Sequence, residues 1–366
     1  MSLLFLHTGN DWAGTARAFA VAAKRLAARG HDAAFACLSD TVVEARAARE
    51  ELDVVALPLG TSGARDTWRL RAVLQERKPD AVFVHTEREQ LVVSSAARLA
   101  SSTRVIRRIS AGAAFQAGRA SRIASRLAAV TALFNSEQER RNAANAGLAV
   151  PSAVAPLGID VAAYDDVRPA PRESINAPLQ SRLVVCVFEP TARARISVVL
   201  RTMAQLAPRH PEVRLAVVGS GSNDENLRMH AAALGITNVV SFLGERDDEL
   251  EILASADVGW VAANCDAAAF AYMDFMGLRI PVIAEREPLA QHYIADGITG
   301  VLIPQSDAPE TAALVATLLA KGDQRAAMGN GGRARVAREF PESAMIDGFE
   351  RAAAAVGAPQ PEPALR

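Results

Sequence analysis

The fold is decided by residues 1–38, which read MSLLFLHTGNDWAGTARAFAVAAKRLAARGHDAAFACL. Two short apolar runs, Leu3–His7 and Ala33–Cys37, flank a stretch rich in Ala, Leu, Lys and Arg that favours helix over Thr15–Ala28. Gly30 follows this stretch at a position typical of helix ends. A strand, a helix and a second strand in this order predict a βαβ unit on a parallel sheet.

The same alternation continues along the chain, with one break at residues 161–182, where three prolines predict a linker. We therefore expect two doubly wound α/β domains, at residues 1–160 and 183–340, followed by a C-terminal helix and tail at 341–366. The spacing of Ser136-Glu137-Gln138-Glu139 is that of a capping box and predicts a helix start. The expected strands are Leu3–His7, Ala33–Cys37, Val54–Leu57, Ala81–His85, Arg104–Arg108, Val130–Asn135, Leu183–Phe188, Arg214–Val218, Val239–Leu243, Val258–Val261, Pro281–Ala284 and Val301–Ile303.

The composition is that of an ordinary globular protein. With 50% hydrophobic and 22% charged residues, the 366-residue chain is not disordered, and at roughly 100–200 residues per domain it predicts two domains. Its three cysteines, Cys37, Cys186 and Cys265, form no C-x-x-C pair, so we expect buried thiols in a reducing cytoplasm. The short apolar run at the N-terminus predicts neither a signal peptide nor a membrane span.

Charge is divided unevenly along the chain, although the whole carries a net charge of −1. Residues 1–160 hold 21 Lys and Arg against 15 Asp and Glu, a net of +6, whereas residues 161–366 hold 19 against 26, a net of −7. Such asymmetry indicates that the first half meets an anionic partner, such as a membrane surface or an acidic acceptor.

An arginine-rich stretch without acidic residues runs from Gln90 to Ser136. Within it Arg119, Arg122 and Arg126 recur at helical spacing, so a helix here would carry one basic face. Such a helix is expected to contact the inner face of a membrane peripherally, and a solvated helix face is the alternative. Aromatic residues barely interleave the stretch, which argues against nucleic acid as a partner.

Ligands of doubly wound sheets bind in the loops at the carboxyl ends of the strands. The loop after the first expected strand carries Gly9 and Gly14 and leads into a helix, where backbone amides would suit a phosphate; a plain turn is the alternative. The loop Gly219-Ser220-Gly221 has only two glycines of a dinucleotide fingerprint, which disfavours NAD. His7 and His85 end expected strands at the same edge. No Cys/His spacing suits a metal, so we expect no metal and no cofactor.

Five segments spread over nearly the whole chain match motifs that occur together in one family. They are Thr15–Ala36, with its Ala-Arg-Gly-His; Asn135–Arg141; Pro156–Asp160, which is similar to P-N-G-V-D; Val213–Val261; and Asp296–Ile303, which is similar to D-G-x-x-G-x-L-V. In this order they resemble the family 4 glycosyltransferases. The resemblance implies the GT-B fold, in which two Rossmann-like domains face each other across a cleft, and an enzyme of the hexosyltransferase type.

The resemblance also implies roles for single residues. Aligned through Pro281–Ala284, Asp266 and Asp274 stand at the family's two glutamate positions, eight residues apart, one methylene shorter than in the family. Asp266 would then be catalytic and face the donor sugar, and Asp274 would hold the nucleotide ribose. Ser110 is a second catalytic candidate because it stands where the family has a histidine after the fifth strand. Phe270 falls between the two aspartates on the donor side.

The family's diphosphate-binding cations are replaced here. Phe188-Glu189 and Ala194-Arg195 stand where the family has Gly-Arg and Lys-Gly, so Arg193 or Arg195 is expected to hold the phosphates instead, since a guanidinium suits phosphate well. The expected donor-binding residues are Asp274, Arg193, Arg195, Gly9, Gly14, Gly219 and Phe270. The expected acceptor-side residues in the first domain are His85, Arg107 and Arg108.

Together these features predict a retaining, metal-independent glycosyltransferase. It would move a sugar from a nucleotide-diphosphate donor to a glycan or lipid-linked acceptor, in polysaccharide or glycolipid biosynthesis. One alternative is a family member that keeps the fold but binds or scaffolds without sugar transfer, which the altered cations favour. Another is a different activity of the same fold, such as sugar epimerisation or phosphorolysis.

Overall fold

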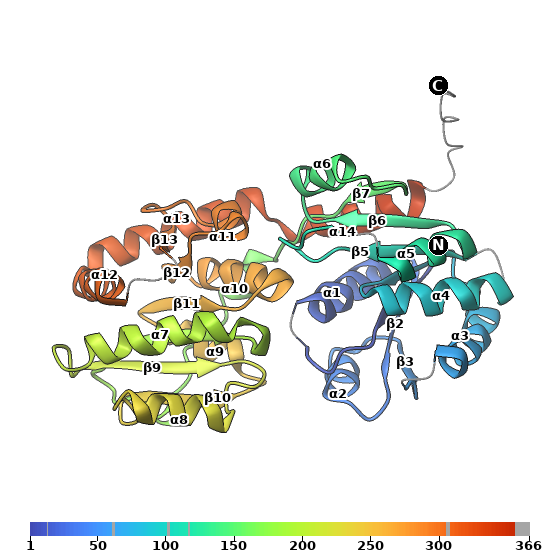
Figure 1. Ribbon diagram of the computed structural model, residues 1–366. Helices are drawn as coiled ribbons and strands as arrows, with labels where there is room; N and C mark the ends of the chain where they lie inside the picture. The colour runs from blue at the N-terminus through green and yellow to red at the C-terminus, as the bar shows by residue number, and fades with distance from the viewer. Residues whose placement is uncertain (13, 61–62, 101–102, 116–117, 305–307, 356–366) are drawn as a thin grey trace. The chain divides into compact units, whose positions relative to one another are not determined.

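The computed structural model describes residues 1–355 apart from residues 13, 61–62, 101–102, 116–117 and 305–307. The chain forms two compact units. The first consists of Met1–Leu157 and the segment that starts at Ser343, and the second of Gly158–Glu342 (Figure 1). The described residues after Glu342 therefore return to the unit in which the chain began.

The first unit is built on a parallel sheet of seven strands in the order β3-β2-β1-β4-β5-β6-β7. The winding reverses beside β1, so that β1 and β4 are neighbours and the loops after them meet at one edge. The strands are β1 (Ser2–His7), β2 (Asp32–Leu38), β3 (Val54–Leu57), β4 (Ala81–Val84), β5 (Arg104–Arg108), β6 (Val130–Phe134) and β7 (Ser152–Val154).

Helices cover this sheet, and α3 packs against α4, which packs against α5. The returning C-terminal helix is held by Phe349, whose ring packs edge-on against Phe83 with centroids 5.3 Å apart and also contacts Phe5 and Phe19. The helices are α1 (Thr15–Ala28), α2 (Val42–Arg49), α3 (Gly63–Arg77), α4 (Glu87–Ala100), α5 (Arg119–Leu127), α6 (Glu137–Asn145) and α14 (Glu342–Ala354).

The second unit repeats the architecture on a parallel sheet of six strands in the order β10-β9-β8-β11-β12-β13. The strands are β8 (Arg182–Phe188), β9 (Val213–Val218), β10 (Val240–Gly244), β11 (Val258–Ala262), β12 (Val282–Glu285) and β13 (Gly300–Ile303). The helices are α7 (Arg193–Leu206), α8 (Glu225–Ala233), α9 (Glu249–Ala254), α10 (Cys265–Gly277), α11 (Pro288–Tyr293), α12 (Ala308–Ala320) and α13 (Gly322–Glu339), with short 3₁₀ turns η1 (Val161–Tyr164), η2 (Arg172–Ile175) and η3 (Pro190–Ala192).

The two doubly wound α/β sheets expected from the alternation are confirmed, and every expected strand occurs within a few residues of its predicted bounds. The capping box at Ser136 is confirmed too, because the Glu139 amide donates to the Ser136 hydroxyl at 3.2 Å. Strand β7 was not expected. It is a three-residue strand at the end of the sheet order, and so short a segment shows little periodicity.

Residues 161–182, expected as a linker, lie within the second unit. Their prolines interrupt any regular period, but the segment still folds into η1 and η2 and buries apolar side chains. Tyr164, Ala170 and Ile175 are all buried. Burial of these side chains removes apolar surface from water, which is why the segment packs as part of a domain. The division falls at residue 158 rather than at residue 160.

Candidate functional site

Three of the residues singled out in the first half of the sequence lie at the carboxyl edge of the first unit's sheet. A cavity of about 410 Å³ opens there after β4 and β5. His85, Arg107 and Ser110 are brought together in its lining, because His85 follows β4 while Arg107 lies in the neighbouring strand β5 and Ser110 follows it. The full lining is His85, Thr86, Glu87, Arg107, Arg108, Ile109, Ser110, Ala113, Ala114, Phe115 and Gly118.

The imidazole of His85 lies between two hydroxyl groups. Its Nδ1 is 3.4 Å from the Thr15 hydroxyl at the start of α1, and its Nε2 is 3.4 Å from the Ser110 hydroxyl. The two hydroxyls therefore orient the ring, and either nitrogen is able to carry the proton. This arrangement suits binding of a hydroxylated ligand, since the ring and both hydroxyls donate and accept hydrogen bonds.

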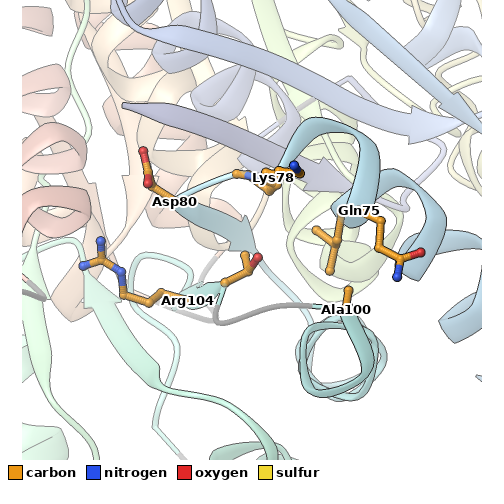
Figure 2. A pocket seen from close by; sticks show the side chains of 8 residues that line it. Gln75, Lys78, Asp80, Ala100 and Arg104 are labelled. Atoms are coloured by element: carbon orange, nitrogen blue, oxygen red, sulfur yellow. The ribbon is translucent and has the colours of Figure 1, made fainter.

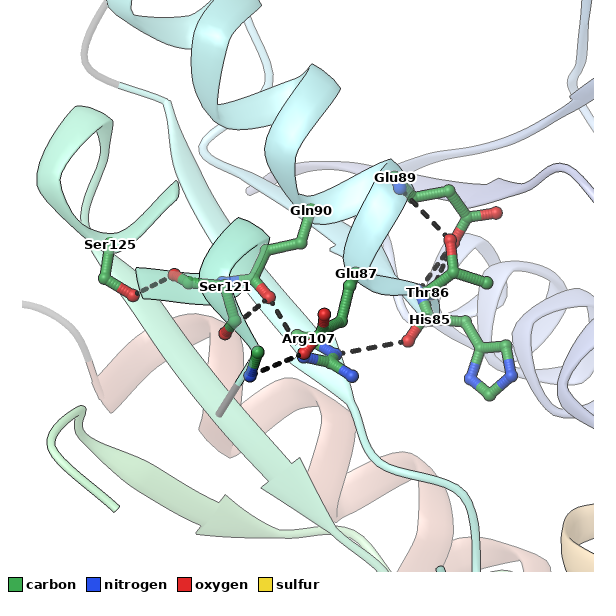
Figure 3. A network of polar contacts seen from close by, with 9 residues as sticks. His85, Thr86, Glu87, Glu89, Gln90, Arg107, Ser121 and Ser125 are labelled. Carbon is green, nitrogen blue, oxygen red and sulfur yellow. Dashed lines mark hydrogen bonds and ion pairs between the residues drawn. The ribbon is translucent and has the colours of Figure 1, made fainter. Parts of the chain in front are cut away.

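Arg107 is the centre of a polar network beside this histidine (Figure 3). Its guanidinium contacts the Glu87 carboxylate at 3.3 Å, the Gln90 side-chain oxygen at 3.2 Å and the His85 carbonyl at 3.4 Å. Burial lowers the pKa of Arg107, and the Glu87 charge opposes that shift. The amide of Gly118 also donates to the Glu87 carboxylate, at 3.1 Å. A cation and a backbone amide thus converge on one anionic group at this edge.

Arg108 behaves differently from its neighbour. Its side chain is fully buried, and the guanidinium donates to the Ala155 carbonyl at 3.3 Å. Because strand residues alternate between the two faces of a sheet, Arg107 and Arg108 point to opposite sides. The Arg108 side chain therefore points into the protein, although Arg108 also borders the cavity.

The glycine loop after β1 lies on a buried histidine. A Cβ at Gly9 would lie 2.6 Å from Nε2 of His7, so the imidazole packs directly under the loop. Neither ring nitrogen of His7 has a hydrogen-bond partner among the residues that the structure describes, and burial lowers the pKa of this imidazole. Gly14 adopts a φ of 56° before α1, which glycine allows. The loop also includes Ala13, which lies outside the described residues.

Sequence reasoning missed Glu89, the third residue of α4. This buried carboxylate receives hydrogen bonds from the amides of Thr8, His85 and Thr86 and from the Thr8 hydroxyl, at 2.7–2.9 Å. The signal was present, since Thr86-Glu87-Arg88-Glu89 has the spacing of a capping box. The long-range bond to Thr8 leaves no trace in that spacing.

In the second unit, the two arginines expected to hold phosphate are both paired with carboxylates. Arg193 lies 2.7 Å from Asp224, with 57% of its side chain exposed. Arg195 is 16% exposed and makes two hydrogen bonds to Glu287, at 2.7 and 2.6 Å. These hydrogen bonds to Glu287 raise the pKa of Arg195. Both cations are therefore neutralised by neighbouring groups of the same unit.

More acidic groups surround Arg195. Glu285, at the end of β12, lies 3.9 Å from its guanidinium, and burial raises the pKa of that carboxyl. Glu189, which stands at an expected cation position, accepts the Asn264 amide at 3.0 Å before α10. Burial, and after it the charges of Asp266 and Glu189, raises the pKa of the Cys265 thiol to about 11. This edge is thus richer in acids than in cations, and its thiol is protonated at neutral pH.

The expected pair of aspartates lies on α10. Asp266 is in the first turn of the helix and Asp274 near its end, and both are buried. The Asp274 carboxylate accepts a hydrogen bond from the Tyr164 hydroxyl of η1. Phe270 is buried on the same helix between them. The structure therefore places the two carboxylates on one element and gives Asp274 a partner within the protein.

Gly219 opens the loop after β9 in a conformation that only glycine adopts readily. Its φ is +118°, and a Cβ there would lie 2.2 Å from the carbonyl oxygen of Phe188. The backbones of the β8 and β9 loops therefore approach each other closely at this point. Within the described part of the chain, no cluster of three or more His, Cys, Asp or Glu side chains has the arrangement of a metal site.

A second cavity of about 610 Å³ lies at the amino-terminal edge of the first sheet, where none of the expected site residues lies. Lys78 and Asp80 border it before β4, and Arg104 borders it at the start of β5 (Figure 2). Because the strands are parallel, this edge is opposite the one that carries His85 and Ser110. The two cavities are therefore separate features of the unit.

The basic helix expected around Arg122 is α5. Arg119, Arg122 and Arg126 are all exposed, and Ile123 beside them is 49% exposed, whereas Ser121 and Ala124 face the protein. Among the helices of the described residues, none is long and apolar enough to cross a lipid bilayer.

Two family models match the chain, one on each unit. Residues 13–158 match the glycosyl transferase 4-like domain, and residues 167–335 match the glycosyl transferases group 1. The chain is also similar to a solved structure of an Anabaena protein, HepE, in complex with UDP and glucose, with a TM-score of 0.78 and 19% identity, covering 97% of this chain and 100% of that one. This likeness supports the GT-B fold.

Curated relatives match over shorter lengths. A GDP-mannose-dependent monoacylated alpha-(1-6)-phosphatidylinositol monomannoside mannosyltransferase of Corynebacterium glutamicum is 27% identical over 198 residues, covering 50% of this chain and 51% of the relative. A lipopolysaccharide core biosynthesis glycosyltransferase, LpsE, of Rhizobium meliloti is 23% identical over 178 residues, covering 49% and 51%. The chain thus spans about half the length of the curated relatives it matches.

Proposed function

Because the chain belongs to the family 4 glycosyltransferases, we propose that it moves a sugar from a nucleotide-diphosphate donor to a glycan or lipid-linked acceptor. The observation that carries this proposal is the match of both units to glycosyltransferase family models, each on a doubly wound sheet. Relatives that act on a phosphatidylinositol mannoside and in lipopolysaccharide core biosynthesis support the acceptor class.

The second unit is the proposed donor side. Asp266 would face the donor sugar and Asp274 the ribose, as the family resemblance implies. Transfer with retention proceeds through an oxocarbenium-like transition state while the diphosphate leaves with its charge. In a metal-independent reaction, protein cations must stabilise that charge, and Arg195 is the more buried of the two candidates. Its release from Glu287 would then be part of donor binding.

The first unit is the proposed acceptor side. Its cavity presents His85 and Ser110 for hydroxyl groups and Arg107 for an anionic group. Glu87 now supplies the negative charge beside Arg107, at 3.3 Å, and a phosphate of the acceptor would replace it. The excess of positive charge in residues 1–160, a net of +6, attracts the same class of acceptor.

The basic face of α5 is the proposed site of peripheral membrane contact. Exposed Arg119, Arg122 and Arg126 would face anionic head groups, and Ile123 would enter the interface. Replacing the three arginines with glutamine should lower the fraction of protein that cosediments with vesicles of anionic lipid. The fraction that cosediments with vesicles of neutral lipid should not change. A control of equal charge change, with Arg201, Arg209 and Arg228 of the second unit replaced, should bind as the wild type does. Equal loss in both variants would contradict the assignment.

One observation favours a second candidate function, binding or scaffolding without sugar transfer. Both arginines expected to hold the diphosphate are paired with carboxylates, Arg193 with Asp224 and Arg195 with Glu287. A nucleotide must compete with these acids. If the nucleotide cannot displace these carboxylates, the second unit keeps the fold but does not bind a donor.

Calorimetry with free nucleotides and a panel of nucleotide sugars separates the two functions. The glycosyltransferase proposal expects binding of at least one donor at or below millimolar concentration, and the absence of any binding would exclude it. Incubation with a donor labelled in the sugar then identifies the reaction. The label should move to an acceptor, whereas an epimerised or phosphorolysed sugar would indicate another activity of the fold.

Asp274 has a matched test because its partner is known. Asp274→Asn should weaken donor binding by about 1 kcal/mol, since a hydrogen bond from the ribose to an ionised acceptor is replaced by one to a neutral amide. Tyr164→Phe removes the internal hydrogen bond and leaves the carboxylate in place, so it should bind the donor as the wild type does. If the two variants bind equally, Asp274 serves only to hold Tyr164.

A further inference from the structure

Three helices of the first unit begin with the same sequence pattern, a hydroxyl residue followed three positions later by glutamate. The segments are Thr41–Glu44 at α2, Thr86–Glu89 at α4 and Ser136–Glu139 at α6. In each, the glutamate amide donates to the hydroxyl, at 3.3, 3.1 and 3.2 Å respectively. Each carboxylate also accepts the amide of the residue before the hydroxyl, at 2.6, 2.8 and 3.1 Å. The pattern is a helix N-cap used three times.

Glu89 does more than cap its own helix. Its Oε2 accepts the amides of His85 and Thr86, at 2.8 and 2.9 Å, as a cap requires. Its Oε1 reaches the loop after β1, where it accepts both the amide and the hydroxyl of Thr8, each at 2.7 Å. The residue is only 3% exposed. Glu44 contrasts with it, because its carboxylate accepts the Asp40 amide near the protein surface.

The two loops that Glu89 joins meet beside His85, where the Thr15 hydroxyl at the end of the glycine loop lies 3.4 Å from the imidazole. Thr8 begins the loop that contains Gly9 and Gly14, and His85 lines the cavity of about 410 Å³. We propose that Glu89 is a positioning residue, which fixes the glycine loop and His85 in one relative arrangement for the substrate. The effect on catalysis rests on the proposed function. The effect on the position of the loops rests on the hydrogen bonds alone.

A carboxylate is required at this position because all four partners are donors. The two oxygens of an ionised glutamate accept all four hydrogen bonds without conflict. In Glu89→Gln, one oxygen is replaced by an amino group that itself donates, so two of the four donors lose their acceptor. Bonds to an ionised acceptor are also stronger than bonds to a neutral one. The glutamine amide can present its one oxygen to either pair of donors, so the variant should loosen both loops while the side-chain volume stays the same.

His7 provides a reporter of the loop that needs no activity. Its imidazole is buried directly under Gly9. While Glu89 holds Thr8 in place, reagents cannot reach this ring. When the loop is released, diethyl pyrocarbonate should modify it, because the neutral imidazole is the reactive form.

The first experiment compares Glu89→Gln with Glu44→Gln, the matched change at an ordinary cap. Hydrogen exchange at the amides of Thr8 and His85, together with the rate of His7 modification, should rise at least tenfold in Glu89→Gln. Glu44→Gln should leave all three unchanged, because the remaining side-chain oxygen can still accept the Asp40 amide. Wild-type protection at Thr8 and His7 in Glu89→Gln would overturn the proposal and reduce Glu89 to a helix cap.

The second experiment measures steady-state transfer. Glu89→Gln should lose at least 100-fold in kcat/KM, with kcat falling as well as KM rising, whereas Glu44→Gln should keep wild-type values. Thr8→Val removes only the hydroxyl donor and should lose about tenfold, so it tests the proposal even if Glu89→Gln does not fold. Unchanged kinetics in Thr8→Val and Glu89→Gln would refute the positioning role. If the wild type transfers no sugar, the proposed function fails, and the exchange data still decide whether Glu89 holds the loops.

Discussion

The carboxylates at the carboxyl edges of the two sheets have different partners. In the first unit, Glu87 pairs with Arg107 beside a cavity, and a second, buried glutamate, Glu89, accepts four hydrogen bonds from neutral donors and holds two loops together. In the second unit, Glu287 and Asp224 pair with Arg195 and Arg193. Both edges therefore pair their arginines with acids, and the first edge differs in having a carboxylate whose partners are loop amides and a hydroxyl.

The glycine loops of the two edges differ in what surrounds the glycine. This difference gives the largest expected effect, a loss of stability on substitution by alanine. Gly219 combines a φ of +118° with a Cβ position 2.2 Å from a backbone oxygen, which cannot move aside. Gly219→Ala should therefore lower the free energy of unfolding by about 3 kcal/mol. At Gly9 the nearest atoms belong to the His7 side chain, which can shift, so Gly9→Ala should cost about 1 kcal/mol.

Urea unfolding of the two variants measures this difference. Gly235→Ala is the control for φ alone, because Gly235 has a φ of +70° with nothing near its Cβ position, and it should cost about 1 kcal/mol. If Gly219→Ala and Gly235→Ala are equally stable, the close approach to Phe188 has no energetic weight. The proposed difference between Gly219, which is confined by backbone atoms, and Gly9, which is confined by a side chain, would then be wrong.

The second effect concerns the hidden cation of the second unit. Glu287→Gln removes the charge that competes with a diphosphate for Arg195, so affinity for UDP or GDP should rise about tenfold, or about 1.4 kcal/mol. Calorimetry measures it directly. Glu339→Gln breaks another ion pair of the same unit, the 3.2 Å contact with Arg335 on α13, and should leave affinity unchanged. A fall in affinity in Glu287→Gln would show that Glu287 supports the site rather than blocks it.

The smallest effect is a pH dependence at the first edge. Burial lowers the pKa of His7 from 6.5, so the unfolded chain takes up a proton at a higher pH than the folded chain does. The wild type should therefore lose stability as the pH falls below about 6.5, until the folded protein is protonated as well. Arg195, at the other edge, keeps its charge throughout this range because a guanidinium stays protonated in proteins, and its hydrogen bonds to Glu287 raise its pKa further.

Melting temperatures of the wild type and His7→Gln, compared at pH 7.5, 6.5 and 5.5, isolate this contribution. The melting temperature of the wild type should fall relative to that of the variant as the pH falls, because the variant has no imidazole to protonate at that position. Other buried groups, such as His292, contribute equally to both proteins. A difference that stays constant over the three pH values would show that His7 does not titrate between the folded and unfolded states.

Much of the fold was predictable because its signals are local. Alternating apolar runs located the strands, and the spacing from Ser136 to Glu139 located the start of a helix. Strand β7 and the packed segment at residues 161–182 were not predictable in this way. One is three residues long, and the other is held by the burial of scattered side chains such as Tyr164.

The candidate site was predictable only in its membership. His85 was expected at the end of a strand, Ser110 from the family resemblance and Arg107 as an acceptor-side residue, and the cavity brings the three together. The roles of Asp266 and Asp274 remain predictions from the family resemblance. The sequence did not reveal which charged side chains form ion pairs. Arg193 and Arg195 were expected to hold phosphate, and each forms an ion pair with a carboxylate of the protein.

The order of strands and helices follows from the chain alone, because backbone preferences and apolar periodicity act over a few neighbouring residues. Family membership follows from the same string of motifs. Tertiary folding decided which charges meet. Thr8 lies 81 residues from Glu89, and Arg195 lies 92 residues from Glu287. Hydrogen bonds and ion pairs act within about 3–4 Å, so they depend on where the loops of distant strands come to rest.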